Sequence, residues 1–237
     1  MATRTATHAG SWYTADGRKL DRELSQYLAA VEPSPEFQPP IKGCKAIIAP
    51  HAGYSYSGPA AAWAYKSIDT TGIERVFVLG PSHHVYLDGC ALSQCQEYAT
   101  PIGNLPLDLD VIEELRQTGK FSDMSLQTDE DEHSIEMHLP YVRKIFEGKD
   151  IKIVPILVGA INKSTEEQFG AIVAPYLTQP NTMFVVSSDF CHWGTRFQYT
   201  FYYPESPPSS KSPIRLSRAE RNPPSLSTHP ITLPSQP

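Results

Sequence analysis

Polar side chains that can bind a metal or transfer a proton follow three short apolar runs of this 237-residue chain. The apolar runs are residues 46–49, 76–79 and 183–186. The side chains that follow them are His51, His83, His84, Asp189 and His192. Because ligands in open α/β sheets bind beyond the carboxyl ends of the strands, we expect these side chains to meet at one edge of a sheet.

This set of side chains predicts a metal pocket, since histidine is the commonest protein metal ligand and also titrates near neutral pH. Two histidines with a carboxylate suit non-haem Fe(II), whereas two histidines with a thiolate suit copper or zinc. A further histidine beside the metal would serve as a general acid or base. The alternative is that each histidine only satisfies backbone groups of its own loop. That explanation weakens when three strand ends carry such residues.

A second cluster of ionisable side chains lies within residues 128–138. It contains Glu132, His133, Glu136 and His138. These four could form a metal site of their own, or they could belong to an acidic loop that leads into a helix, with Glu136 and His138 pointing in different directions. We favour a supporting role, in which His133 or Glu136 lies at the rim of the pocket.

The elements that must position these residues alternate between strand and helix patterns. Short β-branched runs at 46–49, 76–79, 151–158 and 183–186 have the composition of buried parallel strands. Helical patterns cover residues 20–28, 60–68, 112–115 and 135–146, where Pro140 should kink the helix or delay its start. Ser164-Thr-Glu-Glu167 predicts a capping box that opens another helix. The alternation predicts an α/β fold with a mostly parallel sheet flanked by helices.

Composition divides the chain near Tyr203. Nine of the 22 prolines fall in residues 204–237. That segment carries a net charge of +2 and residues 1–203 carry −8, which together give the chain's net charge of −6. We expect 1–203 to form the α/β domain and 204–237 to be a disordered Pro/Ser-rich tail. The acidic balance disfavours nucleic-acid binding, and no apolar run is long enough for a membrane span. With no signal-peptide pattern, we expect a cytoplasmic or nuclear setting.

Five motifs together resemble the Memo family, whose eukaryotic members mediate cell motility driven by receptor tyrosine kinases. The motifs are His8-Ala-Gly-Ser-Trp-Tyr13, Ala49-Pro-His-Ala-Gly-Tyr54, Leu79-Gly-Pro-Ser-His-His84, the segment 125–140, and Val185-Val-Ser-Ser-Asp-Phe-Cys-His-Trp-Gly194. The resemblance covers roughly residues 7–203. It implies the fold of the class III extradiol dioxygenases, which are non-haem iron enzymes.

The resemblance also assigns roles to residues of this sequence. It makes His51 and His83 metal ligands for iron or copper, and it places Asp189 and His192 among the catalytic pocket residues. His192 falls where the dioxygenases keep their acid/base histidine. Trp12 and Tyr56 fall on the pocket wall, and we place His84 in the same substrate pocket.

The family pattern continues beyond Tyr203 and there supplies a third ligand, a cysteine, which this chain does not match. No cysteine follows Cys191. We therefore expect a C-terminally truncated domain that binds iron or copper weakly and whose metal-dependent oxidoreductase chemistry, if the family has any, is impaired.

Three functions are open at this point. The first is a redox-active metal pocket that admits oxygen or a phenolic small molecule. The second is a non-catalytic adaptor whose histidines bind a phosphotyrosine peptide. The third is a zinc hydrolase, which needs the same third ligand and has no motif of its own.

Overall fold

The computed structural model describes residues 2–189 and 192–201. The chain divides into two units, Met1–Asp189 and Phe190–Pro237, which are described separately below. The predicted boundary at residue 203 and the predicted disorder of 204–237 lie outside the described residues and stay predictions.

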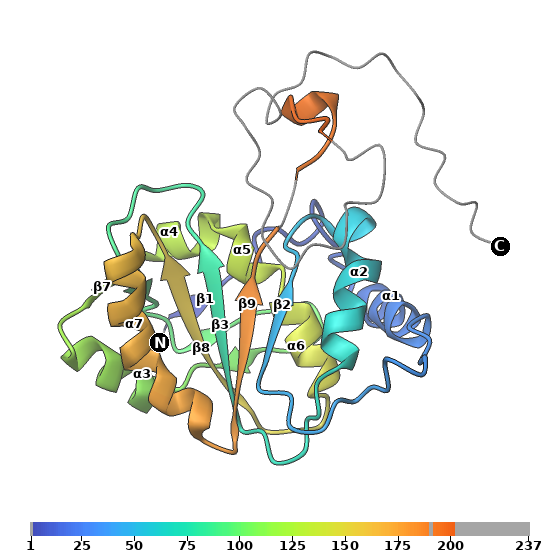
Figure 1. Cartoon of the computed structure of the whole chain (residues 1–237), viewed down its shortest axis with the longest axis horizontal. Helices are drawn as coiled ribbons and strands as arrows, with labels where there is room; N and C mark the ends of the chain where they lie inside the picture. Colours follow the sequence, from blue (N-terminus) through green and yellow to red (C-terminus); the bar gives the residue numbers. More distant parts are fainter. Residues whose placement is uncertain (1, 190–191, 202–237) are drawn as a thin grey trace, which may run out of the picture. The chain divides into compact units, whose positions relative to one another are not determined.

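A six-stranded sheet forms the centre of the first unit (Figure 1). Its strands, in the order β2-β9-β3-β8-β4-β7, are β2 (Ala46–Ala49), β9 (Thr182–Ser187), β3 (Arg75–Pro81), β8 (Lys152–Val158), β4 (Cys90–Leu92) and β7 (Phe121–Asp123). The first four run parallel, and β4 pairs antiparallel with β8. The predicted α/β class with a mostly parallel sheet is therefore confirmed, and the four predicted strands form its parallel part.

Helices pack on both faces of this sheet. They are α1 (Gly17–Ala29), α2 (Tyr54–Lys66), α3 (Leu109–Gln117), α4 (Leu126–Asp131), α5 (His133–Glu136), α6 (Leu139–Ile145) and α7 (Lys163–Thr178). Helix α6 begins next to Pro140, which confirms that this proline delays the helix start. The capping box predicted at Ser164 was wrong, because Asn162 caps α7 and accepts a hydrogen bond from the Thr165 backbone N–H.

Alternate residues of β3 show which helix lies on which face. The ring of Phe77 stacks on Phe184 at 4.5 Å and lies 5.2 Å from Tyr176 of α7. Gly80 faces the opposite side, where a Cβ atom would come within 2.8 Å of the side chain of Ile135 in α5. Because side chains alternate along a strand, α7 and α5 cover opposite faces of the sheet.

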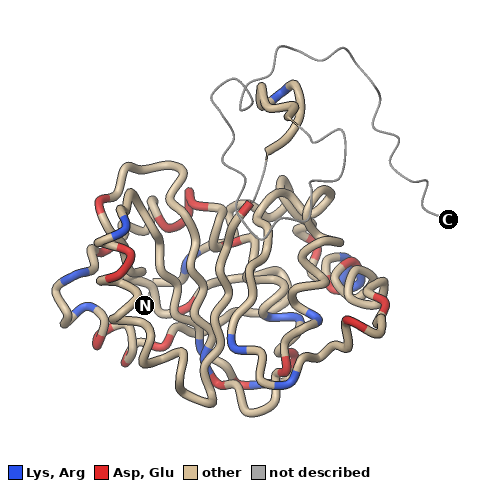
Figure 2. The backbone as a smooth tube through the Cα atoms, in the orientation of Figure 1, with Lys and Arg blue, Asp and Glu red and all other residues tan. Residues whose placement is uncertain are grey.

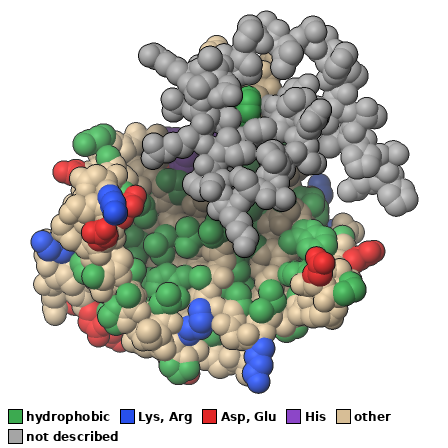
Figure 3. Space-filling model, viewed as in Figure 1, with side chains coloured by type: hydrophobic (Ala, Val, Ile, Leu, Met, Phe, Trp, Pro, Cys, Tyr) green, Lys and Arg blue, Asp and Glu red, His purple; other side chains and the backbone are tan. Residues whose placement is uncertain are grey.

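The α7 face is apolar and only partly covered. An apolar cavity of about 410 Å³ lies between α7 and the sheet, where Leu79, Val158 and Phe169 are among its lining residues. Towards the edge strand β2, Ile48 is 53% exposed. Hydrophobic side chains gather on this face in Figure 3, and Figure 2 shows the charged residues mainly on the surrounding helices and loops. The sheet therefore presents an apolar surface beside α7.

Two smaller features complete the described residues. Strands β1 (Thr3–Arg4), β5 (Glu97–Tyr98) and β6 (Leu105–Pro106) form a second sheet. In the second unit, Thr195–Phe197 form a 3₁₀ turn. The Trp193 indole N–H, before the turn, donates a hydrogen bond to the Phe201 carbonyl, after it, at 2.8 Å. Among the helices that the structure describes, none has the length and apolarity needed to cross a membrane.

Candidate metal centre

Three of the predicted site residues meet at the carboxyl edge of the parallel strands. His51, His83 and Asp189 each lie two residues beyond the ends of β2, β3 and β9. Strand β9 lies between the other two, and Asp189 after it contacts His51. The centroids of the His51 and His83 rings are 5.1 Å apart, at an interplanar angle of 69°. The structure thus brings the two predicted metal ligands together, while their role as ligands stays a prediction.

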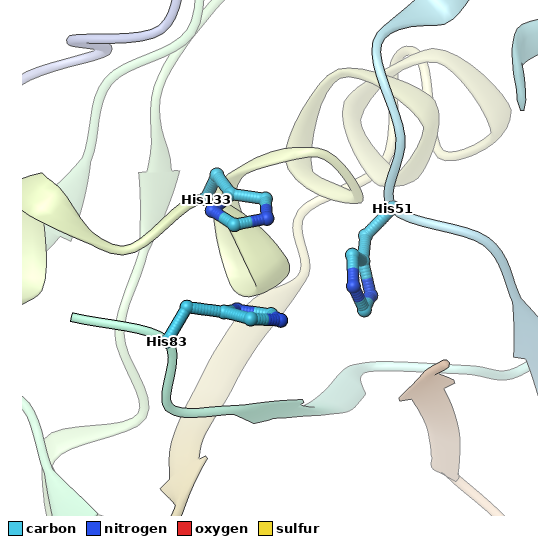
Figure 4. A group of neighbouring side chains, drawn as sticks. All are labelled: His51, His83 and His133. Carbon is cyan, nitrogen blue, oxygen red and sulfur yellow. The ribbon is translucent and has the colours of Figure 1, made fainter. Parts of the chain in front are cut away.

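A third imidazole joins this pair. His133, the first residue of α5, offers a ring nitrogen that lies with one nitrogen each of His51 and His83 inside a 4.8 Å group (Figure 4). Its ring stacks on His83 at 4.4 Å and lies 5.5 Å from His51. The sequence indicated His133 for the rim of the pocket, whereas the structure places it within the ligand group.

Ser187 determines which nitrogen of His51 carries the proton. Its hydroxyl donates to the Ser134 carbonyl at 2.7 Å, so the single hydroxyl proton is already used. The 2.7 Å contact between Ser187 Oγ and His51 Nδ1 therefore requires the imidazole to donate. With the proton on Nδ1, the lone pair is on Nε2, where a metal can bind.

Glu132 does the same for His83. Its carboxylate accepts the backbone N–H of His83 at 2.7 Å and lies 2.9 Å from the Nδ1 atom of the ring. Burial raises the pKa of Glu132, but hydrogen bonds from Ser134 and His83 outweigh burial and lower this pKa below its ordinary value. The ionised carboxylate can only accept, so Nδ1 of His83 carries the proton and Nε2 is left free.

His133 packs against two aromatic rings. His83 stacks on it at 4.4 Å, and Trp12 lies at 4.4 Å with its ring tilted by 31°. Burial lowers the pKa of His133 to about 4, so the ring is neutral at physiological pH and available as a ligand. His84 stands perpendicular to it, with ring centroids 6.0 Å apart. Trp12 and His84, both predicted for the substrate pocket, therefore lie beside the three histidines.

The remaining predicted residues differ in how the structure places them. Asp189 accepts the backbone N–H of His51 at 3.0 Å, and its Oδ2 atom lies 3.7 Å from His51 Nε2. Tyr56 lies near the start of α2 and is 84% exposed, so its pocket role stays a prediction. His192 belongs to the second unit, and its acid/base role also stays a prediction.

The second cluster is divided among separate networks. Glu136 accepts hydrogen bonds from the Tyr13 hydroxyl and the His8 backbone N–H, and it pairs with Arg4 at 2.8 Å. His138 is buried and contacts the Tyr65 hydroxyl through Nδ1 at 2.7 Å. The four cluster residues therefore do not share one site, and the arrangement fits the alternative in which Glu136 and His138 point in different directions.

Sequence reasoning missed Ser187 as a part of the site and His8 as a neighbour of His133. Ser187 shares a strand face with Met183 and Val185, which are both fully buried. A polar residue on that buried face is the feature of the sequence that could have indicated its role. His8 pairs with Glu136 through Nδ1 at 2.8 Å, and its ring lies 5.7 Å from Trp12. The His8–Trp12 spacing was visible, but nothing in the sequence connects it to Glu136.

The donor set fits a single transition metal. Imidazole nitrogens suit copper, zinc and iron, and three of them leave coordination positions open. His83 is 38% exposed at the side chain, which gives the group access to solvent. The Glu132 and Asp189 carboxylates in contact with the ligands would also offset the charge of a cation.

Comparison with known proteins agrees with the motifs. The family described as "Memo-like protein" matches residues 4–221. Protein MEMO1 of Xenopus tropicalis is 53% identical over 201 residues, which cover 84% of this chain and 66% of that protein. Human Protein MEMO1 is 52% identical over 204 residues, which cover 85% and 67% of the two chains.

A nematode relative extends this range. The Caenorhabditis elegans "Protein memo-1 homolog" is 48% identical over 200 residues, covering 84% of this chain and 55% of that protein. The chain spans about two thirds of the length of the vertebrate relatives that it matches. On the extent of the family match and on these identities, the chain is a member of the Memo-like protein family.

Proposed function

We propose that this chain is a metal-binding Memo-family protein whose pocket holds one iron or copper ion through His51, His83 and His133. The observation that carries the proposal is the convergence of three imidazole nitrogens within 4.8 Å, two of them with their other nitrogen already hydrogen-bonded. That pattern of outer contacts is typical of histidines that bind metals. A bound ion would supply redox or Lewis-acid chemistry at the exposed side of the group.

The protein's own residues set the conditions for that chemistry. Ser187 and Glu132 keep the Nδ1 protons in place, and Trp12 shields one face of His133. Asp189 lies beside His51 and would orient a substrate or accept a proton. The phenolic small molecule expected from the family resemblance would enter beside His83 and His84, and His192 stays the proposed acid/base.

The third imidazole changes the premise for weak binding. The expectation of weak iron or copper binding assumed two protein ligands, whereas His133 offers a third. We therefore propose binding that survives dialysis. The link to receptor signalling and cell motility comes from the family resemblance and stays part of the proposal.

The alternative of a phosphotyrosine-binding adaptor has less support from the local charge. The Glu132 and Asp189 carboxylates contact His83 and His51, and the buried guanidinium of Arg4 is paired with Glu136 and Asp129. A phosphate dianion would meet these carboxylates, whereas a metal cation would be stabilised by them. The arrangement therefore favours a cation.

Metal analysis of two adjacent-histidine variants tests the proposal. Wild-type protein, His83→Ala and His84→Ala are loaded separately with Fe(II), Cu(II) and Zn(II), dialysed and analysed for metal content. We expect about one ion per chain for the wild type and for His84→Ala, and a large loss for His83→Ala. Equal retention by both variants, or none by the wild type, would contradict a site built on His83.

A further inference from the structure

One buried carboxylate contacts two of the three histidines. Glu132 is 2% exposed and lies between α4 and α5. Its Oε2 atom accepts the backbone N–H of His83 at 2.7 Å, and its Oε1 atom lies 2.9 Å from His83 Nδ1. The same Oε1 is 3.5 Å from Nδ1 of His133. Both imidazoles therefore lie within 4 Å of the same carboxylate oxygen.

These contacts fix more than the protonation of His83. The backbone and the ring of His83 bind the two oxygens of one carboxylate, so both the loop and the ring orientation are set together. Glu132 also caps α5 by accepting the Ser134 backbone N–H at 2.9 Å, and α5 begins with His133. The side chain therefore connects the loop after β3 to the start of α5.

The Nδ1 atom of His133 is a buried polar atom whose hydrogen bond is not satisfied by the described residues. Glu132 Oε1 is the acceptor 3.5 Å away. A ring that binds a metal through Nε2 carries its proton on Nδ1. A small shift of the ring would bring that proton to Glu132.

We propose that Glu132 is the positioning residue of the metal centre: it holds His83 in the tautomer with a free Nε2 and receives the Nδ1 proton of His133. This inference rests on the proposed metal function and extends it to a residue that does not itself bind the metal. Losing such an outer contact typically lowers metal affinity by about 10–100-fold.

Glu136 provides a matched control for Glu132. It is a buried glutamate four residues along the chain, and its carboxylate contacts Arg4, His8 and Tyr13. Glu132→Gln and Glu136→Gln remove the same charge and change almost no volume. A glutamine at 132 has one acceptor oxygen for three donors, so its amide must face at least one of the sites now occupied by N–H groups.

The test combines a spectroscopic signature with an affinity. Long-range ¹H–¹⁵N spectra of the metal-free, histidine-labelled protein report which ring nitrogen of His83 is protonated, and a His83→Ala spectrum assigns the signals. We expect the Nδ1–H form in the wild type and in Glu136→Gln, and a shift towards the Nε2–H form in Glu132→Gln. Competition with a chromophoric chelator for Cu(II) and Zn(II) should then show about 10–100-fold weaker binding for Glu132→Gln alone.

The outcomes separate this inference from the proposed function. A wild type that binds no metal overturns the proposed function. A wild type that binds metal while Glu132→Gln binds equally well overturns only the role of Glu132. Should Glu132→Gln fail to fold, as judged by near-ultraviolet circular dichroism, the wild-type spectrum still decides, because an Nε2–H tautomer of His83 would contradict the inference.

Discussion

At the scale of single residues, the site depends on where a few protons are held. The Ser187 hydroxyl donates a hydrogen bond to the Ser134 carbonyl and accepts one from His51 Nδ1–H. Neither group is exposed enough for water to replace this bond freely, since Ser187 and His51 are each 5% exposed. A buried group that loses its partner costs about 1–3 kcal/mol.

Ser187→Ala should therefore weaken both the fold and the metal site. We expect the free energy of unfolding to fall by about 1–3 kcal/mol and metal affinity to fall by about 10–100-fold. Ser188→Ala is the matched control, because the Ser188 hydroxyl makes only a 3.3 Å contact to the Asp189 carbonyl. Urea unfolding and chelator competition check the pair, and equal effects of the two variants would disprove the role given to Ser187.

At the scale of elements, the close approach of β3 and α5 brings His133 to His83. Gly80 permits this approach, since a Cβ atom there would lie 2.5 Å from Ser134 Oγ and 3.1 Å from the Ile135 backbone nitrogen. His83 lies two residues beyond the end of β3, and His133 is the first residue of α5. The spacing between these elements therefore sets the spacing between two candidate ligands.

Gly80→Ala should force the two elements apart. Overpacking of this kind costs about 1–3 kcal/mol, and we expect metal affinity to fall with it because His133 moves away from His83. Gly170→Ala in α7 is the same substitution where nothing lies within 4 Å, and alanine there should leave the fold unchanged or stabilise it by up to about 1 kcal/mol. Thermal melting and metal titration compare the two; unchanged metal binding in Gly80→Ala would contradict the coupling.

The sequence allowed prediction of the long elements but not of this approach. The runs that became β2, β3, β8 and β9 are continuous β-branched segments, which carry a clear pattern. Strands of two residues, such as β1 and β5, and the four-residue helix α5 are too short for any periodicity to appear. The sequence therefore indicated His51 and His83, whereas the place of His133 depends on tertiary packing.

At the scale of the whole molecule, buried neutral histidines make the stability depend on pH. Burial lowers the pKa of His133 to about 4 and that of His138 to about 3, compared with about 6.5 in an unfolded chain. Below pH 6.5 these histidines therefore bind protons in the unfolded chain but stay neutral in the folded protein. The free energy of unfolding should fall as the pH is lowered from 7 towards 4.

Urea unfolding of the metal-free protein at pH 7 and pH 5 measures this effect. We expect a lower midpoint at pH 5, and a smaller decrease in His138→Gln, which cannot gain the proton at that position. An unchanged midpoint between the two pH values would show that these histidines are not buried in neutral form.

The most direct measurement for the whole account is an X-ray absorption spectrum of the copper-loaded or zinc-loaded chain. The structure predicts nitrogen scatterers at about 2.0–2.1 Å with the outer-shell features of several imidazoles, which should decrease in His133→Ala. A sulfur scatterer at about 2.3 Å, or a shell of oxygen atoms without imidazole features, would contradict a centre made of His51, His83 and His133.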